Sequence, residues 1–401
     1  MTVDIKKGKA AGTVAAPPSK SMAHRSLICA ALTNESRVSG LEYSVDITAT
    51  SECLKAMGAV LTKTENGVKI GGLDPRKIPE CELYCFESGS TLRFLIPLCL
   101  LSNNKITLKG SRRLLERPLS IYAELCKEKE LFFEQSADGV TVKGPLCGGI
   151  YRVAGDVSSQ FISGLLFALP LCQEDSEIEI IGKLESASYI NLTIKSLADF
   201  GIEIERTKKG FKIKGGQNYK SADLSVEGDW SNAAFLDALT LLGGDTAVTG
   251  LDDKSLQGDR VYRDHFKALK QGFAKIDLSD CPDLAPILFS LAAALHGAEF
   301  TGTRRLKIKE SDRAEAMREE LSKFKTKVTV EENRVIVIGG GLCAPNVPLY
   351  GHNDHRIVMS LAVLCTLTGG TIEGAEAVAK SFPDFFEKLK SLGVGMTINE
   401  A

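Results

Sequence analysis

Charged and hydroxyl-bearing residues recur directly before long apolar stretches in this chain of 401 residues. Six such clusters are recognisable: SKSMAHR at 19–25, ESGSTLR at 87–93, SSQF at 158–161, DWSN at 229–232, DCPD at 280–283 and NDHR at 353–356. Each precedes an expected helix, whose first backbone N–H groups and dipole attract anions. Because most clusters also carry Lys, Arg, His or an amide, they predict a binding site for anionic small molecules.

The residue types in these clusters favour metal-free chemistry on phosphorylated substrates. Lys20 and Ser21 stand at the positive end of the first helix, with Arg25 about one turn further along. Lys and Arg suit phosphate or carboxylate groups. Asp283 and Glu310 occupy matching places in neighbouring units and could transfer protons. Any one cluster could be simple helix capping or a solvated surface, but together they exceed what capping requires.

Other functions are disfavoured by the same sequence. The two histidines at 352 and 355 lack further ligands at suitable spacing, so we expect no metal. There is no P-loop and no well-placed GxGxxG motif, which disfavours a nucleotide-dependent kinase or dehydrogenase, and we expect no cofactor. A net charge of -2 and 6% aromatic residues give no support for a nucleic-acid or membrane-surface partner.

Cysteine usage and apolar runs predict a cytoplasmic protein. The eleven cysteines are scattered without a CxxC pair, which is typical of reduced thiols. The start Met1–Asp4 has no signal-peptide character. The longest apolar run, Phe161–Cys172, is short and contains Pro170, so we expect no membrane span.

The elements that must position the clusters form a repeat. Each apolar helix is followed by a short strand that ends in glycine, as in Lys105–Gly110. Amphipathic periodicity predicts a second helix in most units: Ile47–Met57, Leu119–Lys129, Tyr189–Phe200, Ser311–Phe324 and Pro383–Leu392. Hairpin turns such as Asn66-Gly67 and Asp138-Gly139 close the units. The helix openings recur about every 70 residues except between the fourth and fifth, so the fourth unit is expected to be truncated.

Several short motifs, in this order and spacing, resemble one enzyme family over nearly the whole chain. They are PSKS with Arg25, ESGSTLR at 87–93, ERP at 116–118, SSQ at 158–160, Ser186 with Tyr189, KESDR at 309–313, NDHR at 353–356 and AKSFP at 379–383. The chain resembles the 5-enolpyruvylshikimate-3-phosphate (EPSP) synthases, the enolpyruvyl transferases of the shikimate pathway in aromatic amino acid biosynthesis.

The resemblance implies an α/β fold of two inside-out α/β barrels, each built from three helix-strand-helix-hairpin repeats. The expected domains are 19–228, and 1–18 with 229–401, with the active site in the cleft between them. The implied reaction transfers the enolpyruvyl group of phosphoenolpyruvate to the 5-hydroxyl of shikimate 3-phosphate by addition and elimination. We expect a monomer.

Residue roles follow from the same resemblance. Catalysis is assigned to Asp283, Glu310 and Lys20. Shikimate 3-phosphate is expected at Lys20, Ser21, Arg25, Ser158, Ser159, Gln160, Ser186, Tyr189, Asp283 and Lys309. Phosphoenolpyruvate is expected at Lys20, Gly89, Arg117, Gln160, Arg313, Arg356 and Lys380.

Three departures from the family pattern and two alternatives remain. The stretch Cys126–Phe133 lacks the usual Gly-Ala turn after its helix, and the region Gln271–Asp280 is shorter than usual. The loop reads Glu87-Ser88-Gly89-Ser90, with Phe94 after Arg93, where many members have Asn-Ala-Gly-Thr and a proline. The retained Gly89 favours glyphosate sensitivity. The sister family that acts on UDP-N-acetylglucosamine is an alternative, disfavoured because Lys20 precedes Ser rather than Asn and no Cys lies in 112–117. An RNA-end-processing protein of related fold is a more distant one.

Overall fold

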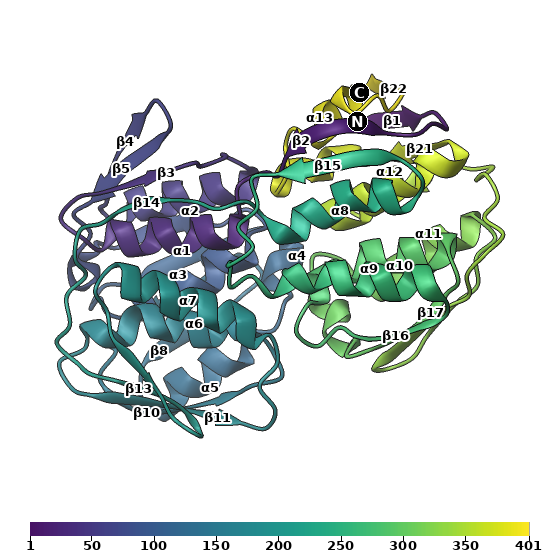
Figure 1. Cartoon of the computed structure of the whole chain (residues 1–401). Helices are drawn as coiled ribbons and strands as arrows, with labels where there is room; N and C mark the ends of the chain where they lie inside the picture. Colours follow the sequence, from purple (N-terminus) through teal and green to yellow (C-terminus); the bar gives the residue numbers. More distant parts are fainter. Residues whose placement is uncertain (401) are drawn as a thin grey trace. The chain divides into compact units, whose positions relative to one another are not determined.

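The computed structural model describes residues 1–400, which fold into two compact units. One unit contains residues 18–227, and the other contains residues 1–17 together with the chain from 228 onwards. Both mix helices with small sheets, with the buried helices inside each unit and the strands towards its periphery (Figure 1). The predicted two-domain α/β class is confirmed. Of the described helices, none is long and apolar enough to cross a membrane.

A four-stranded sheet of order β6-β7-β9-β8 shows the pattern of the unit 18–227. Its elements in chain order are β6 (Cys81–Tyr84), α3 (Gly89–Cys99), β7 (Ile106–Lys109), α5 (Ser120–Glu128), β8 (Phe132–Gln135) and β9 (Val140–Lys143). β6 and β7 pair in parallel across the intervening helix, whereas β8 and β9 form an antiparallel hairpin. A buried helix thus connects two parallel strands, and its N-terminus follows the C-terminal end of the first strand.

The next sheet of this unit repeats the same order, as β10-β11-β13-β12. Its elements are β10 (Gly149–Ala154), α6 (Ser159–Ala168), β11 (Ser176–Ile181), α7 (Ala187–Asp199), β12 (Ile204–Arg206) and β13 (Gly210–Ile213).

In the remaining sheet the first position belongs to β14 (Asp223–Ser225), the last strand of the unit, which pairs in parallel with β3. The other elements are α1 (Lys20–Ala31), β3 (Ser36–Ser39), α2 (Val45–Ala56), β4 (Val60–Thr64) and β5 (Gly67–Gly71). The two ends of this unit are therefore joined within one sheet.

The other unit contains two four-stranded sheets of the same kind and one two-stranded sheet. The first comprises β16 (Ala274–Asp277), α10 (Ala285–Ala294), β17 (Ala298–Thr301), α11 (Arg313–Lys323), β18 (Val328–Val330) and β19 (Arg334–Val337). The second comprises β20 (Leu349–Tyr350), α12 (His355–Thr368), β21 (Gly370–Glu373), α13 (Phe385–Ser391), β22 (Met396–Asn399) and the N-terminal β1 (Thr2–Ile5). The two-stranded sheet pairs β2 (Ala11–Ala15) with β15 (Asp245–Thr249), and α8 (Trp230–Leu241) precedes β15.

The polar clusters lie at the starts of six buried helices: α1, α3, α6, α8, α10 and α12. In five of these helices the N-cap side chain accepts a hydrogen bond from a backbone N–H of the first turn. These caps are Ser19, Ser88, Ser158, Asp229 and Asp354. α10 instead continues from a short 3-10 turn, η4 (Pro282–Leu284). Small polar caps before apolar sequence thus set where each helix begins.

The five predicted second helices are present with starts one or two residues from those predicted, and one further helix was not predicted. The helix expected from Ser311 begins at Arg313, because Asp312 caps it by accepting the Glu315 N–H, and a 3-10 turn, η5 (Arg304–Ile308), ends four residues before the cap. An additional helix, α9 (Tyr262–Gln271), follows β15, where no second helix was predicted. Its buried residues Tyr262, Phe266 and Leu269 have helical spacing. The signal was therefore present in the sequence.

Candidate active site

Lys20 opens α1 and is held by a carboxylate from the next helix. Ser19 caps α1 by accepting the Met22 N–H at 3.4 Å. The Lys20 ammonium lies 2.8 Å from Asp46 Oδ2, and both side chains are largely buried. Asp46 is in the first turn of α2. This carboxylate was not among the predicted site residues. Its position is set by the packing of α2 on α1, which sequence spacing does not reveal.

Arg25, one turn further along α1, is held only by neutral oxygens in its recorded contacts. It donates to Ser21 O at 2.6 Å, to Tyr189 O at 2.9 Å and to Thr193 Oγ1 at 2.9 Å. Its guanidinium also lies 5.1 Å from the centre of the Phe94 ring. Burial lowers the pKa of Arg25 to about 10, so the group remains cationic at neutral pH. The structure thus places the Arg25 guanidinium against the backbone oxygens of Ser21 and Tyr189.

The start of α3 lies against Arg117 and the start of α6. A Cβ added to Gly89 would stand 2.7 Å from Arg117 Nη1, so only glycine leaves that space open. Ser90 Oγ accepts from Gln160 Nε2 at 3.0 Å, and Gln160 Oε1 accepts from Arg93 Nη1 at 2.8 Å. The predicted residues Gly89, Arg117 and Gln160 therefore belong to one neighbourhood.

The remaining predicted hydroxyl groups of this unit lie at the starts of α6 and α7. Ser158 caps α6 by accepting the Gln160 N–H at 3.3 Å, and Ser159 is the first residue of that helix. Ser186 precedes α7 with φ 56° and ψ 40°. This left-handed conformation is uncommon for serine, and such residues concentrate at functional sites.

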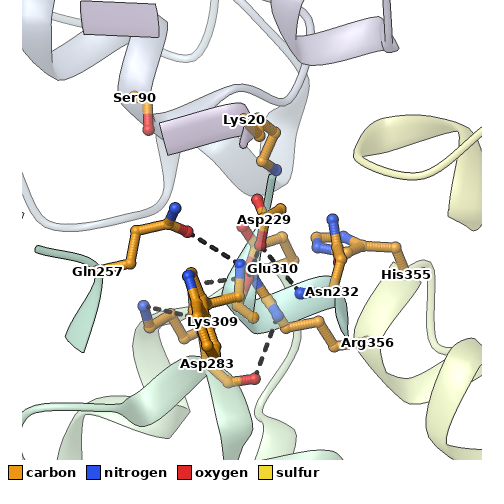
Figure 2. Close-up of polar contacts among 12 residues, drawn as sticks. Lys20, Ser90, Asp229, Asn232, Gln257, Asp283, Lys309, Glu310, His355 and Arg356 are labelled. Carbon is orange, nitrogen blue, oxygen red and sulfur yellow. Dashed lines mark hydrogen bonds and ion pairs between the residues drawn. The ribbon is translucent and has the colours of Figure 1, made fainter. Parts of the chain in front are cut away.

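Asp283 is the centre of the cluster in the other unit (Figure 2). Its Oδ1 lies 3.2 Å from Lys309 Nζ and 2.8 Å from Arg313 Nη1, and its Oδ2 lies 3.1 Å from Arg356 Nη2. Burial alone would raise the pKa of Asp283, but Arg356, Lys309 and Arg313 outweigh burial and hold it well below the ordinary value. The Asp283 side chain is therefore a carboxylate surrounded by three cations.

Arg313 connects Asp283 to two further carboxylates. Its Nη2 lies 2.8 Å from Glu310 Oε2, and its Nε lies 2.9 Å from Asp354 Oδ2. Burial would lower the pKa of Arg313, but Asp354, Glu310 and Asp283 raise it overall. Asp354 also caps α12 by accepting the Arg356 N–H at 2.9 Å. It was not a predicted site residue, although the NDHR motif contains it.

Arg356 of α12 joins the same cluster, and Lys380, the last residue of the 3-10 turn η6 (Ala375–Lys380), contacts the loop before α12. Arg356 Nη2 donates to Ser231 Oγ at 3.0 Å as well as to Asp283. Lys380 Nζ donates to the carbonyl of Asn353 at 2.6 Å, at the start of α12. Every residue predicted for the site in this unit thus has a recorded contact with the cluster or with the loop that forms it.

Across residues 1–400, one group of side chains has ligand atoms close enough for a metal ion: Glu319, Glu320 and His352. Glu320 is fully buried, and both of its oxygens lie 2.9 Å from Lys323 Nζ. Its Oε1 also contacts His352 Nε2 at 2.9 Å. Because the ammonium of Lys323 already neutralises Glu320, this group is explained as an ion-paired anchor between α11 and the loop before α12.

Comparison with known families shows which family the chain belongs to. The family described as EPSP synthase (3-phosphoshikimate 1-carboxyvinyltransferase) matches residues 5–389. The chain belongs to the EPSP synthase family. EPSP synthases are transferases of the shikimate pathway that move the enolpyruvyl group of phosphoenolpyruvate to shikimate 3-phosphate. The predicted family is confirmed.

Individual relatives and structures agree with this membership. A 3-phosphoshikimate 1-carboxyvinyltransferase of Clostridium kluyveri is 42% identical, covering 98% of this chain and 97% of its own. One from Clostridium botulinum is 38% identical, with 98% and 97% covered. The EPSP synthase of Acinetobacter baumannii superposes with a TM-score of 0.79 at 23% identity, covering 100% of both chains. The enolpyruvyl transferase NikO of Streptomyces tendae gives 0.75 at 14% identity, with 100% and 99% covered, and so shares the fold.

Proposed function

We propose that residues of both units of this member of the EPSP synthase family act in one reaction, in which the 5-hydroxyl of shikimate 3-phosphate attacks phosphoenolpyruvate. The main support is the environment of Asp283, a buried carboxylate held by Lys309, Arg313 and Arg356. Such a cluster combines anion-binding cations with a proton acceptor. The match to the EPSP synthase family favours shikimate 3-phosphate over UDP-N-acetylglucosamine as the acceptor.

Shikimate 3-phosphate is assigned mainly to the unit 18–227. Lys20, Ser21 and Arg25 provide cations and a hydroxyl at the start of α1. The other hydrogen-bonding groups assigned to this substrate are Ser158, Ser159, Gln160, Ser186 and Tyr189, together with Asp283 and Lys309 of the other unit. Because Arg25 is held by neutral oxygens, its charge is not cancelled by a neighbouring carboxylate and suits a dianionic phosphate.

Phosphoenolpyruvate is assigned to residues of both units. Gly89 leaves open the space beside Arg117 that a side chain would fill. Arg313 and Arg356 provide two guanidinium groups for the carboxylate of phosphoenolpyruvate. The full set assigned to this substrate is Lys20, Gly89, Arg117, Gln160, Arg313, Arg356 and Lys380.

Binding of phosphoenolpyruvate would activate Asp283. Arg313 and Arg356 lower the basicity of Asp283 through direct contacts. When the substrate carboxylate takes over these guanidinium groups, Asp283 loses much of the charge that depresses its pKa. Asp283 then accepts the proton of the 5-hydroxyl more readily, so the base becomes effective only after the second substrate has bound.

Glu310 and Lys20 are assigned to proton transfer at C3 of phosphoenolpyruvate. The 5-oxygen forms a bond to C2 of phosphoenolpyruvate as its proton passes to Asp283, while Glu310, which enters this step protonated and is assisted by Lys20, adds its proton to C3; the product is a tetrahedral adduct with a methyl group. Glu310, now a carboxylate, then takes a proton back from that methyl group as the C2–O bond to phosphate breaks, which restores the double bond. The proton held by Asp283 leaves with the phosphate. General acid and base groups of this kind typically contribute about 10²–10⁴-fold to rate.

The proposed setting is the cytoplasm, with the enzyme acting as a monomer and without a cofactor. All eleven cysteines are free thiols, and eight of them are buried. Thiols of this kind persist in reducing compartments. Sedimentation at assay concentration would test the monomer, because a mass of two or more chains would contradict it.

The deciding experiment measures phosphate release from phosphoenolpyruvate with either shikimate 3-phosphate or UDP-N-acetylglucosamine as acceptor. We expect release only with shikimate 3-phosphate, and loss of release in Asp283→Ala and Glu310→Ala. Release only with the sugar nucleotide would contradict the assigned acceptor. Full activity in both variants would contradict the assigned proton-transfer residues, while circular dichroism checks that each variant is folded.

A further inference from the structure

Four buried side chains form a hydrogen-bonded line across three helices of the unit 18–227. His24 Nδ1 lies 2.8 Å from Thr50 Oγ1, Thr50 Oγ1 lies 2.6 Å from Thr91 Oγ1, and Thr91 Oγ1 lies 2.7 Å from Ser88 Oγ. Each of the four residues is 0% exposed. The line runs from α1 through α2 to the N-cap of α3.

The direction of the hydrogen bonds along this line is determined by its last link. Thr91 donates its hydroxyl hydrogen to Ser88. The Thr50–Thr91 contact therefore needs the hydrogen of Thr50, and Thr50 can then only accept from His24. His24 must carry its hydrogen on Nδ1. Its Nε2, which is buried without a hydrogen-bond partner, is then an unprotonated acceptor rather than a stranded N–H group.

The charge state of His24 agrees with this arrangement. Burial lowers the pKa of His24 well below its ordinary value, and the positive charges of Lys20 and Arg25 lower it further. A protonated imidazole would place a second N–H group, and a charge, in a buried space without an acceptor. His24 is therefore a neutral donor, and its role is structural positioning rather than proton transfer.

This hydrogen-bonded line lies one helical turn from the ion pair between Lys20 and Asp46. Lys20 and His24 are one turn apart on α1, and their partners Asp46 and Thr50 are one turn apart on α2. Residues at this spacing lie on one face of a helix. Two polar contacts therefore join α1 to α2 at successive turns, and the second contact continues through Thr91 to α3.

The far end of the line lies where α3 contributes to the proposed phosphoenolpyruvate site. Ser88 Oγ also accepts the Thr91 N–H at 3.2 Å, so it is the cap that orients the first turn of α3. Gly89 and Ser90 lie between these two residues. Three residues further along α3, the Phe94 ring lies under Arg25. The placement of α3 against α1 thus affects contacts to both proposed substrates.

Buried polar groups of this kind are costly unless they determine a specific arrangement. We propose that His24, Thr50 and Thr91 are positioning residues for phosphoenolpyruvate, which hold the start of α3, with Gly89 and Ser90, in place relative to Lys20 on α1. This inference rests on the proposed function of Lys20 and Gly89. It predicts that breaking the line affects phosphoenolpyruvate more than shikimate 3-phosphate.

The test compares Thr50→Val, which removes one hydroxyl, with Thr50→Ser, which keeps it. The matched control is Thr33→Val. Thr33 is equally buried just beyond the far end of α1, where its hydroxyl donates to Ala30 O at 2.8 Å. We expect Thr50→Val to raise the KM for phosphoenolpyruvate about 10-fold, since small misplacements of binding groups have effects of this order. The KM for shikimate 3-phosphate should change less, and Thr50→Ser should restore most of the loss.

The outcomes separate this inference from the proposed function. If the wild-type enzyme releases phosphate but Thr50→Val changes both KM values equally, or no more than Thr33→Val does, the positioning role is wrong. If the wild-type enzyme is inactive with shikimate 3-phosphate, the proposed function fails first. Should Thr50→Val not fold, Thr91→Val breaks the next link of the same line and must give the same selective rise in KM.

Discussion

The two units hold their cations in different ways. In the unit 18–227, Arg25 donates to two backbone carbonyls and one hydroxyl. In the other unit, Arg313 contacts three carboxylates and Arg356 contacts Asp283. Arg25 therefore keeps a charge that no carboxylate among its contacts offsets, although Lys20 of the same unit is paired with Asp46, whereas the cluster around Asp283 is close to electrically balanced.

This difference suggests a division of labour between the units. A guanidinium held by three neutral oxygens is rigid, keeps its positive charge and has two further N–H groups for a phosphate group. A guanidinium held by carboxylates instead lowers their pKa and is released only when a competing anion arrives. The first arrangement suits tight binding of a phosphorylated substrate, and the second suits proton transfer that depends on substrate binding.

Replacing the central carboxylate of the balanced cluster should have the largest effect. We expect Asp283→Asn to lower kcat about 10³-fold, because the amide cannot accept the hydroxyl proton. Phosphate release at saturating substrates would measure this. The control is Asp237→Asn, a half-buried carboxylate of the same unit that accepts a hydrogen bond from Tyr262. Equal losses in the two variants would show that the effect is one of folding and not of catalysis.

Removing the Arg25 guanidinium should instead affect the binding of shikimate 3-phosphate. We expect Arg25→Ala to raise the KM for shikimate 3-phosphate about 10- to 100-fold, the loss typical of hydrogen bonds to a charged group. Arg25→Lys should recover part of this loss, because it keeps the charge but not the three directed contacts. Arg76→Ala is the control, since Arg76 also donates to a backbone carbonyl, that of Leu171. A fall in kcat without a change in KM would contradict the division of labour.

Replacing Gly89 tests how closely the space beside Arg117 fits phosphoenolpyruvate. We expect Gly89→Ala to raise the KM for phosphoenolpyruvate about 10-fold, because the new methyl group displaces the Arg117 guanidinium by a small distance. The KM for shikimate 3-phosphate should stay within a factor of about two. Gly8→Ala is a suitable control, as no atom lies within 4 Å of the added Cβ there. An unchanged KM in Gly89→Ala would mean that Arg117 does not contact this substrate.

The sequence predicted the helix starts and the short strands well, because caps and strand-ending glycines are local signals. Four of the glycines after these strands, at 182, 250, 302 and 374, have φ between 70° and 79°, which other residues rarely adopt. The helix α9 was missed although its periodicity is clear. The expected start of α11 was two residues early, since the KESDR motif was taken to open the helix and Asp312 proved to be its cap.

The partners of the site residues could not be predicted in the same way. Lys20 meets Asp46 and Arg25 meets Thr193 because helices distant in the sequence pack together. Nor did the sequence indicate that Asp283 would be held by three cations, which changes its expected basicity before substrate binds. Local patterns identify which groups can do chemistry, and tertiary packing determines their charge state.

The smallest predicted effect concerns the pH dependence of stability in the unit 18–227. The pKa of His24 in the folded chain lies well below its ordinary value of 6.5, mainly through burial and then through Lys20 and Arg25. Below pH 6.5 the unfolded chain therefore binds a proton at His24 that the folded chain does not. The contribution of neutral His24 to the free energy of unfolding is complete above pH 6.5 and is lost as the pH falls below it. His24→Asn keeps a donor for Thr50 but does not titrate.

Hydrogen exchange of α1 between pH 5 and 8 would measure this effect locally, which is preferable because a chain of two units need not unfold in one step. Below pH 6.5 the wild-type opening free energy should fall with pH more steeply than that of His24→Asn, by up to about 1.4 kcal/mol per pH unit. The two curves should run parallel above it. Parallel curves over the whole range would mean that the folded and opened chains protonate His24 at the same pH, and the hydrogen-bond order from His24 to Ser88 would then need another explanation.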